Sequence, residues 1–274
     1  MRLHLRLVLL TGLALLLCAC VDLTVVGQFA KSSLEVGEGF KSVMAEGLTS
    51  CEETNKMRGP DVEDCAKLFG PGAQDPLNKV NETLFAYIAS LGKLSGVSVT
   101  GFNSDAIAAD LKTAGASSDI QTKATAASGL GTVIEKVLAG SYEQAKLSKI
   151  IGEQNASVGK VVSFLHDYAA DKYLREFSNQ KTVIANFCAA ERDRHANEPL
   201  ALLLFARACR DEEAAANRRM EAVRKYREAL RAVESGHKKL AESRTKWSLP
   251  ELAKMLGPEI QQLNDAAGKL KAAF

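Results

Sequence analysis

The chain has 274 residues, 46% of them apolar and 6% aromatic, with a formal net charge of +2 at pH 7. Arg2 and Arg6 account for that surplus, because the remaining chain holds 33 basic and 33 acidic side chains. This balance excludes the strongly basic surface of a nucleic-acid-binding protein. The length suffices for one or two domains. Abundant alanine and few aromatic residues make a thin core and favour an elongated helical bundle over a globule.

An apolar run occupies residues 7–17, directly after the two arginines. A short positive region followed by about 7–15 apolar residues is typical of a secretory signal. The run is too short for a membrane-spanning helix, which needs about 20 apolar residues. It ends in the sequence Leu17-Cys18-Ala19-Cys20.

These last residues resemble the lipobox of bacterial lipoproteins, in which an aliphatic residue stands three positions before an invariant cysteine and a small residue directly before it. Leu17 and Ala19 fit those positions for Cys20, whereas Cys18 would place bulky Leu17 at the cut. The resemblance covers only the first 20 residues. It implies a signal peptide at 1–19, cleavage before Cys20, and acyl chains on the Cys20 thiol and on the new amine. Two chains give stable anchoring.

In the Gram-negative sorting pattern, an aspartate directly after the lipid-bearing cysteine retains a lipoprotein in the inner membrane. Val21 stands at that position, so we expect the mature chain, residues 20–274, on the periplasmic face of the outer membrane. An uncleaved anchor and a plain secretory signal are the alternatives.

Four cysteines remain in the mature chain: Cys51, Cys65, Cys188 and Cys209. An even number in an oxidising compartment indicates disulfides, and four cysteines allow three pairings. The first two flank a turn sequence at 58–61, and the last two flank another at 196–199. We therefore predict the pairs Cys51–Cys65 and Cys188–Cys209. The chain has no Cys-x-x-Cys motif or Cys/His cluster, so no metal centre is predicted.

Apolar side chains at helical spacing predict a first helix over about 26–48, followed by a loop at 58–73 with one helical turn. Asp75-Pro76 is a favourable helix start, with aspartate as the N-cap and proline at the first position. That helix should end near Gly96. The only strand-like piece, 97–102, is too short to found a sheet.

A second long apolar stripe predicts a helix from Ser117 or Ser118 to Ile151. Glycine and polar residues at 152–159 then predict a break or kink, which is a possible sub-boundary within the helical domain. Beyond it, the same helical period continues to about Arg194.

Pro199 opens the longest predicted helix, which runs to about Thr245 and spans about 70 Å. Its solvated face carries oppositely charged residues four positions apart: Glu221/Lys225, Arg224/Glu228, Glu234/Lys238 and Glu242/Lys246. A further helix begins at 248–251 and should end at Gly257-Pro258, before a terminal amphipathic helix. The predicted fold is all-α, an elongated antiparallel bundle of long helices with coiled-coil-like hairpins.

One short motif offers a candidate nucleophile. Ser157-Val-Gly-Lys160 matches S-x-x-K, the nucleophile motif of penicillin-binding proteins, in which lysine takes the serine proton. That family also needs an S-x-N element and a K-T-G strand, and neither occurs here. We therefore predict that the protein has no catalytic residues and is not an enzyme.

The remaining candidates are metal-ligand pairs. Glu234 and His237 match one Glu-x-x-His unit of di-iron bundles, but such sites need two units, so we expect a solvated helix end here. Glu191 and His195 lie one turn apart and are expected to form a surface ion pair beside a helix end. His166-Asp167 gives no ligand set. No metal or cofactor is predicted.

These features together predict a lipid-anchored structural or interaction protein with a protein partner in the cell envelope, and with neither nucleic acid nor a small-molecule substrate. Basic and acidic residues interleave along 191–250, which predicts a solvated helix face; within it, the basic stretch 217–231 is the strongest candidate contact for lipid headgroups or an acidic partner. A membrane-active protein that releases an apolar segment, 84–102 or 126–140, is the alternative. A cell-wall enzyme is a third possibility, with Ser157 or the pair Glu191/His195 as its only candidate residues.

Overall fold

A computed structural model describes residues 23–58, 64–96, 129–137, 139–140, 146–243 and 247–273. Every regular element in these residues is a helix, which confirms the predicted all-α class. The elements are α2 (Thr24–Arg58), α3 (Cys65–Phe69), α4 (Pro71–Leu94), α7 (Leu147–Tyr168), the π-helical segment η3 (Ala169–Leu174), α8 (Arg175–Arg194), α9 (Pro199–Ser243) and α10 (Leu249–Ala273). Residues 129–137 are also helical. The signal peptide, Cys20 and the strand-like piece 97–102 lie outside the described residues.

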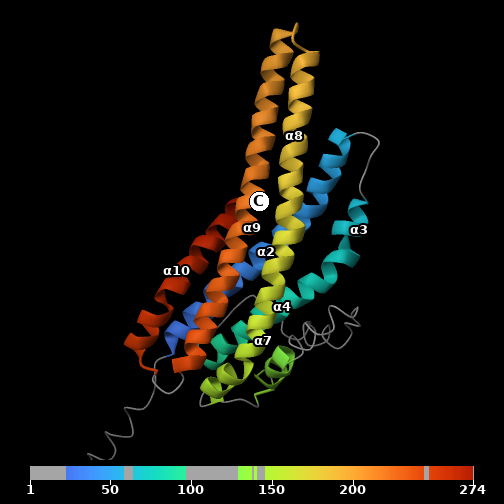
Figure 1. Ribbon diagram of the computed structural model, residues 1–274. Helices are drawn as coiled ribbons and strands as arrows, with labels where there is room; N and C mark the ends of the chain where they lie inside the picture. Colours follow the sequence, from blue (N-terminus) through green and yellow to red (C-terminus); the bar gives the residue numbers. More distant parts are fainter. Residues whose placement is uncertain are drawn as a thin grey trace, which may run out of the picture.

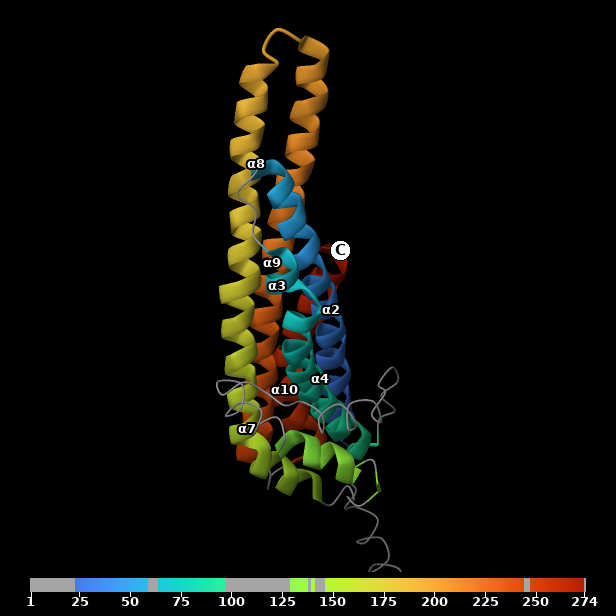
Figure 2. The ribbon, with the colours of Figure 1, turned by 90° about the vertical axis from the view of Figure 1, so that its right-hand side faces the viewer.

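The long helices form an elongated bundle (Figure 1). Helix α9 runs along its whole length, and the α8–α9 hairpin extends beyond the other described helices at one end (Figure 2). The start of α2 lies at the opposite end of the bundle in both views. The tip of the hairpin is therefore the part of the described structure farthest from the start of α2.

The core is built where α2 meets its neighbours. The Phe40 ring of α2 stacks on Tyr226 of α9 with centroids 3.7 Å apart, and Tyr173 of η3 meets Phe40 edge-on. Gly37 lets α4 approach α2 closely, because a Cβ there would lie 2.5 Å from the Phe85 ring. A glycine that weakens helix propensity is here required by packing.

The break predicted at 152–159 is wrong, because α7 runs unbroken through these residues. Ile151 on one side of the segment and Val158 and Val162 beyond it are all buried in the core. Their burial outweighs the cost of a helical glycine, about 1 kcal/mol.

The irregularity lies instead at η3, which begins ten residues after the end of the expected break, nearly three helix turns later. Leu165, Ala169, Tyr173 and Phe177 are all fully buried and follow one another at spacings of four. In an α-helix, four residues advance about 40° past a full turn, so such a row drifts around the helix. The wider π turns reduce this drift and keep the row facing the core.

Three other predicted boundaries are also wrong. Helix α4 begins at Pro71 rather than at Asp75-Pro76. The helix expected up to Ile151 is interrupted by a turn at 139–140, where Gly140 has a φ of +67°. Helix α10 continues through Pro258, because Leu252 and Leu256 before it and Leu263 and Leu270 after it are all buried.

Charged residues of α9 pair in a different register from the one predicted. Arg224 pairs with Glu221 at 3.7 Å and Lys225 with Glu228 at 2.9 Å, both three residues apart. Lys225 also reaches Asp265 of α10 at 3.4 Å. Contacts to the neighbouring helix thus select the rotamers of these long side chains.

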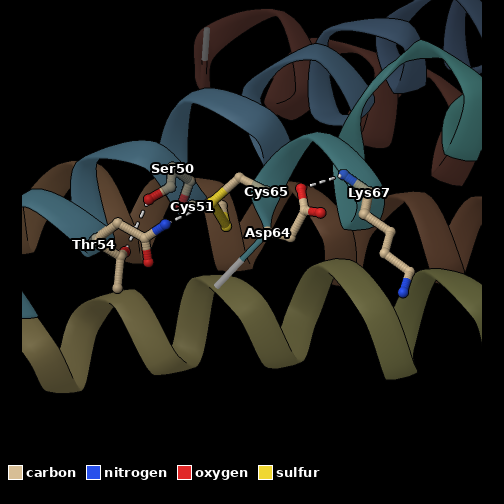
Figure 3. The surroundings of a disulfide bond; sticks show 7 residues. Ser50, Cys51, Thr54, Asp64, Cys65 and Lys67 are labelled. Atoms are coloured by element: carbon tan, nitrogen blue, oxygen red, sulfur yellow. Dashed lines mark hydrogen bonds between the residues drawn. A yellow bond between two sulfur atoms is a disulfide. The ribbon is translucent and has the colours of Figure 1, made fainter. Parts of the chain in front are cut away.

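Both predicted disulfides are confirmed. Cys51–Cys65 ties the last turns of α2 to the start of α3, as Figure 3 shows, with the Asp64 side chain capping α3 through the Lys67 amide. Cys188–Cys209 joins α8 to α9. Both cysteines of the first pair belong to the main core, whereas Cys188 belongs to a small separate cluster.

Candidate functional site

The candidate nucleophile and its base are not brought together. Ser157 and Lys160 share no hydrogen bond within the described structure, although both lie on α7. The Ser157 hydroxyl lies near Gly129, 3.7 Å from where a Cβ would be. Lys160 instead lines a surface cleft. The arrangement offers no activated serine.

His237 does not sit at a solvated helix end, as the sequence predicted, but is fully buried six residues before the end of α9 at Ser243. Its Nε2 lies 2.9 Å from the Tyr87 hydroxyl oxygen, and its Nδ1 lies 3.1 Å from Asn155 Oδ1. Burial lowers the pKa of His237 to about 4, so its ring is neutral at pH 7. Glu234 is exposed on the same helix. His237 is thus part of a core hydrogen-bond network with Tyr87 and Asn155.

Glu191 and His195 form the ion pair predicted for the end of α8, with Glu191 Oε2 3.4 Å from His195 Nε2. Arg194 also contacts Glu191. His166 and Asp167 contact each other at 3.1 Å. In the part of the chain that the structure describes, no group of three or more His, Cys, Asp or Glu side chains is arranged to hold a metal ion.

Three of the six basic side chains in the stretch 217–231 form ion pairs within the protein. Arg219 is nearly buried and pairs with Glu46 and Glu53 of α2. Arg224 and Lys225 form the ion pairs described above. Arg218 and Arg231 are exposed on the same stretch.

The two segments considered for membrane release contribute to the core. Leu84, Tyr87 and Leu91 are fully buried in α4, and Leu130 and Ile134 are fully buried in the helical stretch at 129–137. Residues 97–102, 126–128 and 138 lie outside the described structure. Among the described helices, none combines the length and apolar character that crossing a bilayer requires.

The structure reveals an apolar surface that sequence reasoning missed. We call the part of the hairpin closed by the second disulfide, residues 188–209, the hairpin tip. On it, Leu200, Leu203 and Leu204 are 71%, 65% and 62% exposed. Their spacing of three and four residues puts them on one face of α9. Contiguous exposed apolar side chains of this kind mark interaction surfaces.

The hairpin tip is held together from inside. The rings of Phe187 and Phe205 lie 6.0 Å apart between the two helices. Below them, Ile184, Cys188 and Ala216 form a small buried cluster that Met57 of α2 also contacts. The run "LALLLF" at 200–205 carries apolar residues on two faces of one helix, which was the signal in the sequence for a second, outward-facing stripe.

The structure also has a surface hollow beside α3. This α3 cleft has a volume of about 670 Å³ and is lined by Leu68, Lys160, Ser163, Phe164, Asp167, Tyr168, Asp171, Lys172 and Arg175. Most of these residues come from one face of α7 and η3. The Lys172 ammonium group donates a 2.7 Å hydrogen bond to the Tyr168 hydroxyl and lies over the rings of Phe69 and Tyr168. The cleft thus combines cationic and aromatic side chains.

Comparison of the chain with models of protein families, with curated proteins and with solved structures found no match.

Proposed function

We propose that this protein is a non-catalytic bacterial lipoprotein, held in the outer membrane by acyl chains on Cys20, whose helical body extends into the periplasm and binds a protein partner through the hairpin tip. The observation that carries the proposal is the row of three exposed leucines on a disulfide-closed hairpin that extends beyond the bundle.

The placement of the chain's start supports the anchoring part of the proposal. Helix α2 begins at Thr24, four residues after Cys20. Its first turn lies at the end of the bundle opposite the hairpin tip (Figures 1 and 2). Helix α9 has 45 residues and spans about 68 Å. Lipid on Cys20 would thus hold one end of the bundle at the membrane and leave the tip tens of ångströms away from it.

The three exposed leucines support the proposal that the hairpin tip binds a protein partner. Each leucine that stays in water forgoes about 1.5–3 kcal/mol that its burial would contribute. Leu200, Leu203 and Leu204 form little more than one turn of an amphipathic helix face, with the i, i+3, i+4 spacing of helices that dock into hydrophobic grooves of partner proteins. The tip is also closed by a disulfide and an aromatic contact, so little ordering is needed on binding.

Charge favours a protein over an anionic lipid surface as the partner. Between 188 and 209, the acidic residues Glu191, Asp193 and Glu198 balance Arg192, Arg194 and Arg207. Segments that bind anionic membranes carry an excess of basic residues. A hairpin tip with no excess of basic residues has little electrostatic attraction to an anionic membrane.

The candidate catalytic residues do not converge on one site, and this supports a non-catalytic role. An enzyme needs a nucleophile, a base and stabilising donors converging on one reacting atom. Ser157 and Lys160 share no hydrogen bond, and His237 is enclosed between Tyr87 and Asn155.

Anchoring is tested with the native protein and a Cys20→Ser variant. Mass spectrometry of the native chain should show a lipid-modified amino-terminal Cys20, and fractionation should place it in the outer membrane. The variant should be absent from the outer-membrane fraction. An unmodified thiol at position 20, or a Cys20→Ser variant that stays in the outer membrane, would refute the anchor.

Binding is tested by placing a photo-crosslinking amino acid at position 203 in living cells, with position 254 on exposed α10 as the matched control. We expect one protein adduct from position 203 and none from position 254. Leu200→Gln together with Leu204→Gln should abolish that adduct. Adducts of equal yield at both positions, or adducts to lipid alone, would contradict a protein-binding tip.

A further inference from the structure

We propose that the α3 cleft is a binding site for an amphiphilic monoanion, meaning a molecule that joins one carboxylate or sulfonate group to an apolar body. The inference is independent of the anchor at Cys20 and of the hairpin tip, because it rests on a different part of the molecule.

The lining of the cleft is organised in two rows along one continuous helix. Lys160, Phe164, Tyr168 and Lys172 form the first row, and Ser163, Asp167, Asp171 and Arg175 form the second. Both rows have a spacing of four residues; the first reaches into η3 and the second crosses it. The π turns that keep the buried row facing the core also reduce the drift of these outward rows. They therefore line one cleft instead of winding away from it, and π segments inside α-helices are frequent at functional sites.

The apolar part of the ligand has a platform to contact. Phe164 and Tyr168 lie with their ring centroids 5.7 Å apart, and both side chains are only half-buried. Leu68 of α3 faces the same hollow and is 40% exposed. Three apolar surfaces that converge on one cleft from two elements are what an apolar ligand body requires.

The anionic part has cations available. Lys160 and Arg175 both line the cleft, and neither has an ion-pair or hydrogen-bond partner within the described structure. Lys172 is engaged with Tyr168 but leaves donors to spare, because an ammonium group has three. The cleft therefore holds two unpaired cations at opposite ends of its aromatic platform.

The acidic side chains limit the charge of the ligand. Asp167 already contacts His166 at 3.1 Å, and Asp171 lies in the second row. Three cations against two carboxylates leave the cleft with one net positive charge. A single negative charge on an apolar body matches this balance, whereas a multiply charged ligand would meet the carboxylates unfavourably.

The size of the hollow fits a small molecule. Its volume of about 670 Å³ falls within the range of about 300–1,000 Å³ typical of small-molecule sites. An adjoining hollow of about 400 Å³ shares Leu68, Lys172 and Arg175 with it. Together they give the apolar body room to extend along α8 past Arg175.

The probe for the test is 8-anilinonaphthalene-1-sulfonate, an aromatic monoanion that becomes fluorescent when it leaves water. It is titrated into residues 21–274, the mature chain without the lipid-bearing Cys20 and without the apolar signal, which avoids detergent. Dodecanoate, dodecyltrimethylammonium and inorganic phosphate serve as competitors. We expect saturable binding of one probe per chain, displacement by dodecanoate, and no displacement by the cationic surfactant at submicellar concentration or by phosphate.

Variants locate the site. Lys160→Gln with Arg175→Gln should weaken probe binding about tenfold, because the sulfonate loses the charged hydrogen bonds that these two cations donate. Phe164→Ala should weaken it independently. Lys254→Gln with Lys269→Gln, which removes two exposed cations from α10, should change the Kd less than twofold. Circular dichroism checks that each variant folds.

Three results would overturn the proposal. One is the absence of saturable binding to the folded native chain. Another is equal weakening by the α10 control pair, which would mean attraction to overall charge. The third is displacement of the probe by phosphate, which would mean a simple anion site without a role for the aromatic platform.

Discussion

Tyr87 of α4 and His237 of α9 face each other across the interior of the bundle, with the tyrosine hydroxyl oxygen 2.9 Å from Nε2 of the histidine. Asn155 of α7 accepts from the other ring nitrogen, so the tautomer that satisfies both contacts has its proton on Nδ1. Burial raises the pKa of Tyr87, which keeps its hydroxyl protonated as the donor. One neutral histidine thus links three helices.

We predict that this histidine makes the fold sensitive to acid. Its pKa is about 4 in the folded protein and 6.5 in an unfolded chain, so below pH 6.5 the unfolded state binds more protons. The free energy of unfolding should therefore fall as pH drops from 6.5 towards 4, by about 3 kcal/mol in all. Urea unfolding at pH 7 and pH 4 measures this change.

His237→Gln provides the control for the acid effect, because glutamine bonds similar partners but does not titrate. All other groups titrate equally in both proteins, so the difference between the two pH profiles isolates His237. Parallel profiles would show that acid acts through other groups.

Gly37 gives a second prediction, which concerns helix approach. In Gly37→Ala the new Cβ would lie 2.5 Å from the Phe85 ring and 3.1 Å from its Cβ, so α2 and α4 must move apart. Overpacking of this kind costs about 1–3 kcal/mol. Gly268→Ala on α10 meets nothing within 4 Å and should instead stabilise by about 0.5–1 kcal/mol. Thermal unfolding of both variants should therefore shift in opposite directions, and equal shifts would contradict the close approach.

The helices themselves could be predicted because most of their stability comes from burying one apolar face, which leaves a periodic pattern. Breaks were harder to predict. Gly152 and Pro258 each impose a local cost of about 1–3 kcal/mol, and burial of the apolar residues on both sides exceeds it. The π segment left a signal only in the strict spacing of four between Ala169, Tyr173 and Phe177.

The candidate functional sites could not be predicted from the sequence for a different reason. A motif such as Ser157-x-x-Lys160 specifies sequence spacing, whereas chemistry depends on which face each residue takes in the folded bundle. Leu203 became a surface residue because none of the described helices covers the outer face of α9 at the hairpin tip. Which faces stay uncovered depends on the lengths and order of all the helices together.

The two disulfides should differ in what they stabilise. Cys51 and Cys65 are buried in the main core, so Cys51→Ala with Cys65→Ala should lower the free energy of global unfolding by about 3 kcal/mol. Cys188→Ala with Cys209→Ala loosens the hairpin tip, whose small cluster is separate from that core. In this double variant, amide hydrogen exchange within 188–209 should become much faster, while the amides of the buried part of α4 stay protected. Equal loss of protection in α4 would refute a separately opening tip.

Arg219 supplies the last prediction, because it neutralises a group of carboxylates where α2 ends beside the hairpin. It pairs with Glu46 and Glu53 and donates a 3.1 Å hydrogen bond to Gln180 of α8. Desolvation raises the pKa of Glu53, Arg219 lowers it, and nearby Glu212 and Glu46 raise it further. In Arg219→Met the folded-state pKa of Glu53 should therefore rise more.

A carboxyl group whose pKa is raised by folding favours the folded state at low pH and opposes it as pH rises through that pKa. Arg219→Met should thus cost about 1–3 kcal/mol at pH 7 and less at pH 4.5. Arg231→Met, an exposed arginine on the same helix, is the matched control and should change stability by less than about 0.5 kcal/mol at both pH values. If Arg219→Met costs the same at pH 4.5 as at pH 7, the arginine acts through the packing of its aliphatic stem and not through its charge.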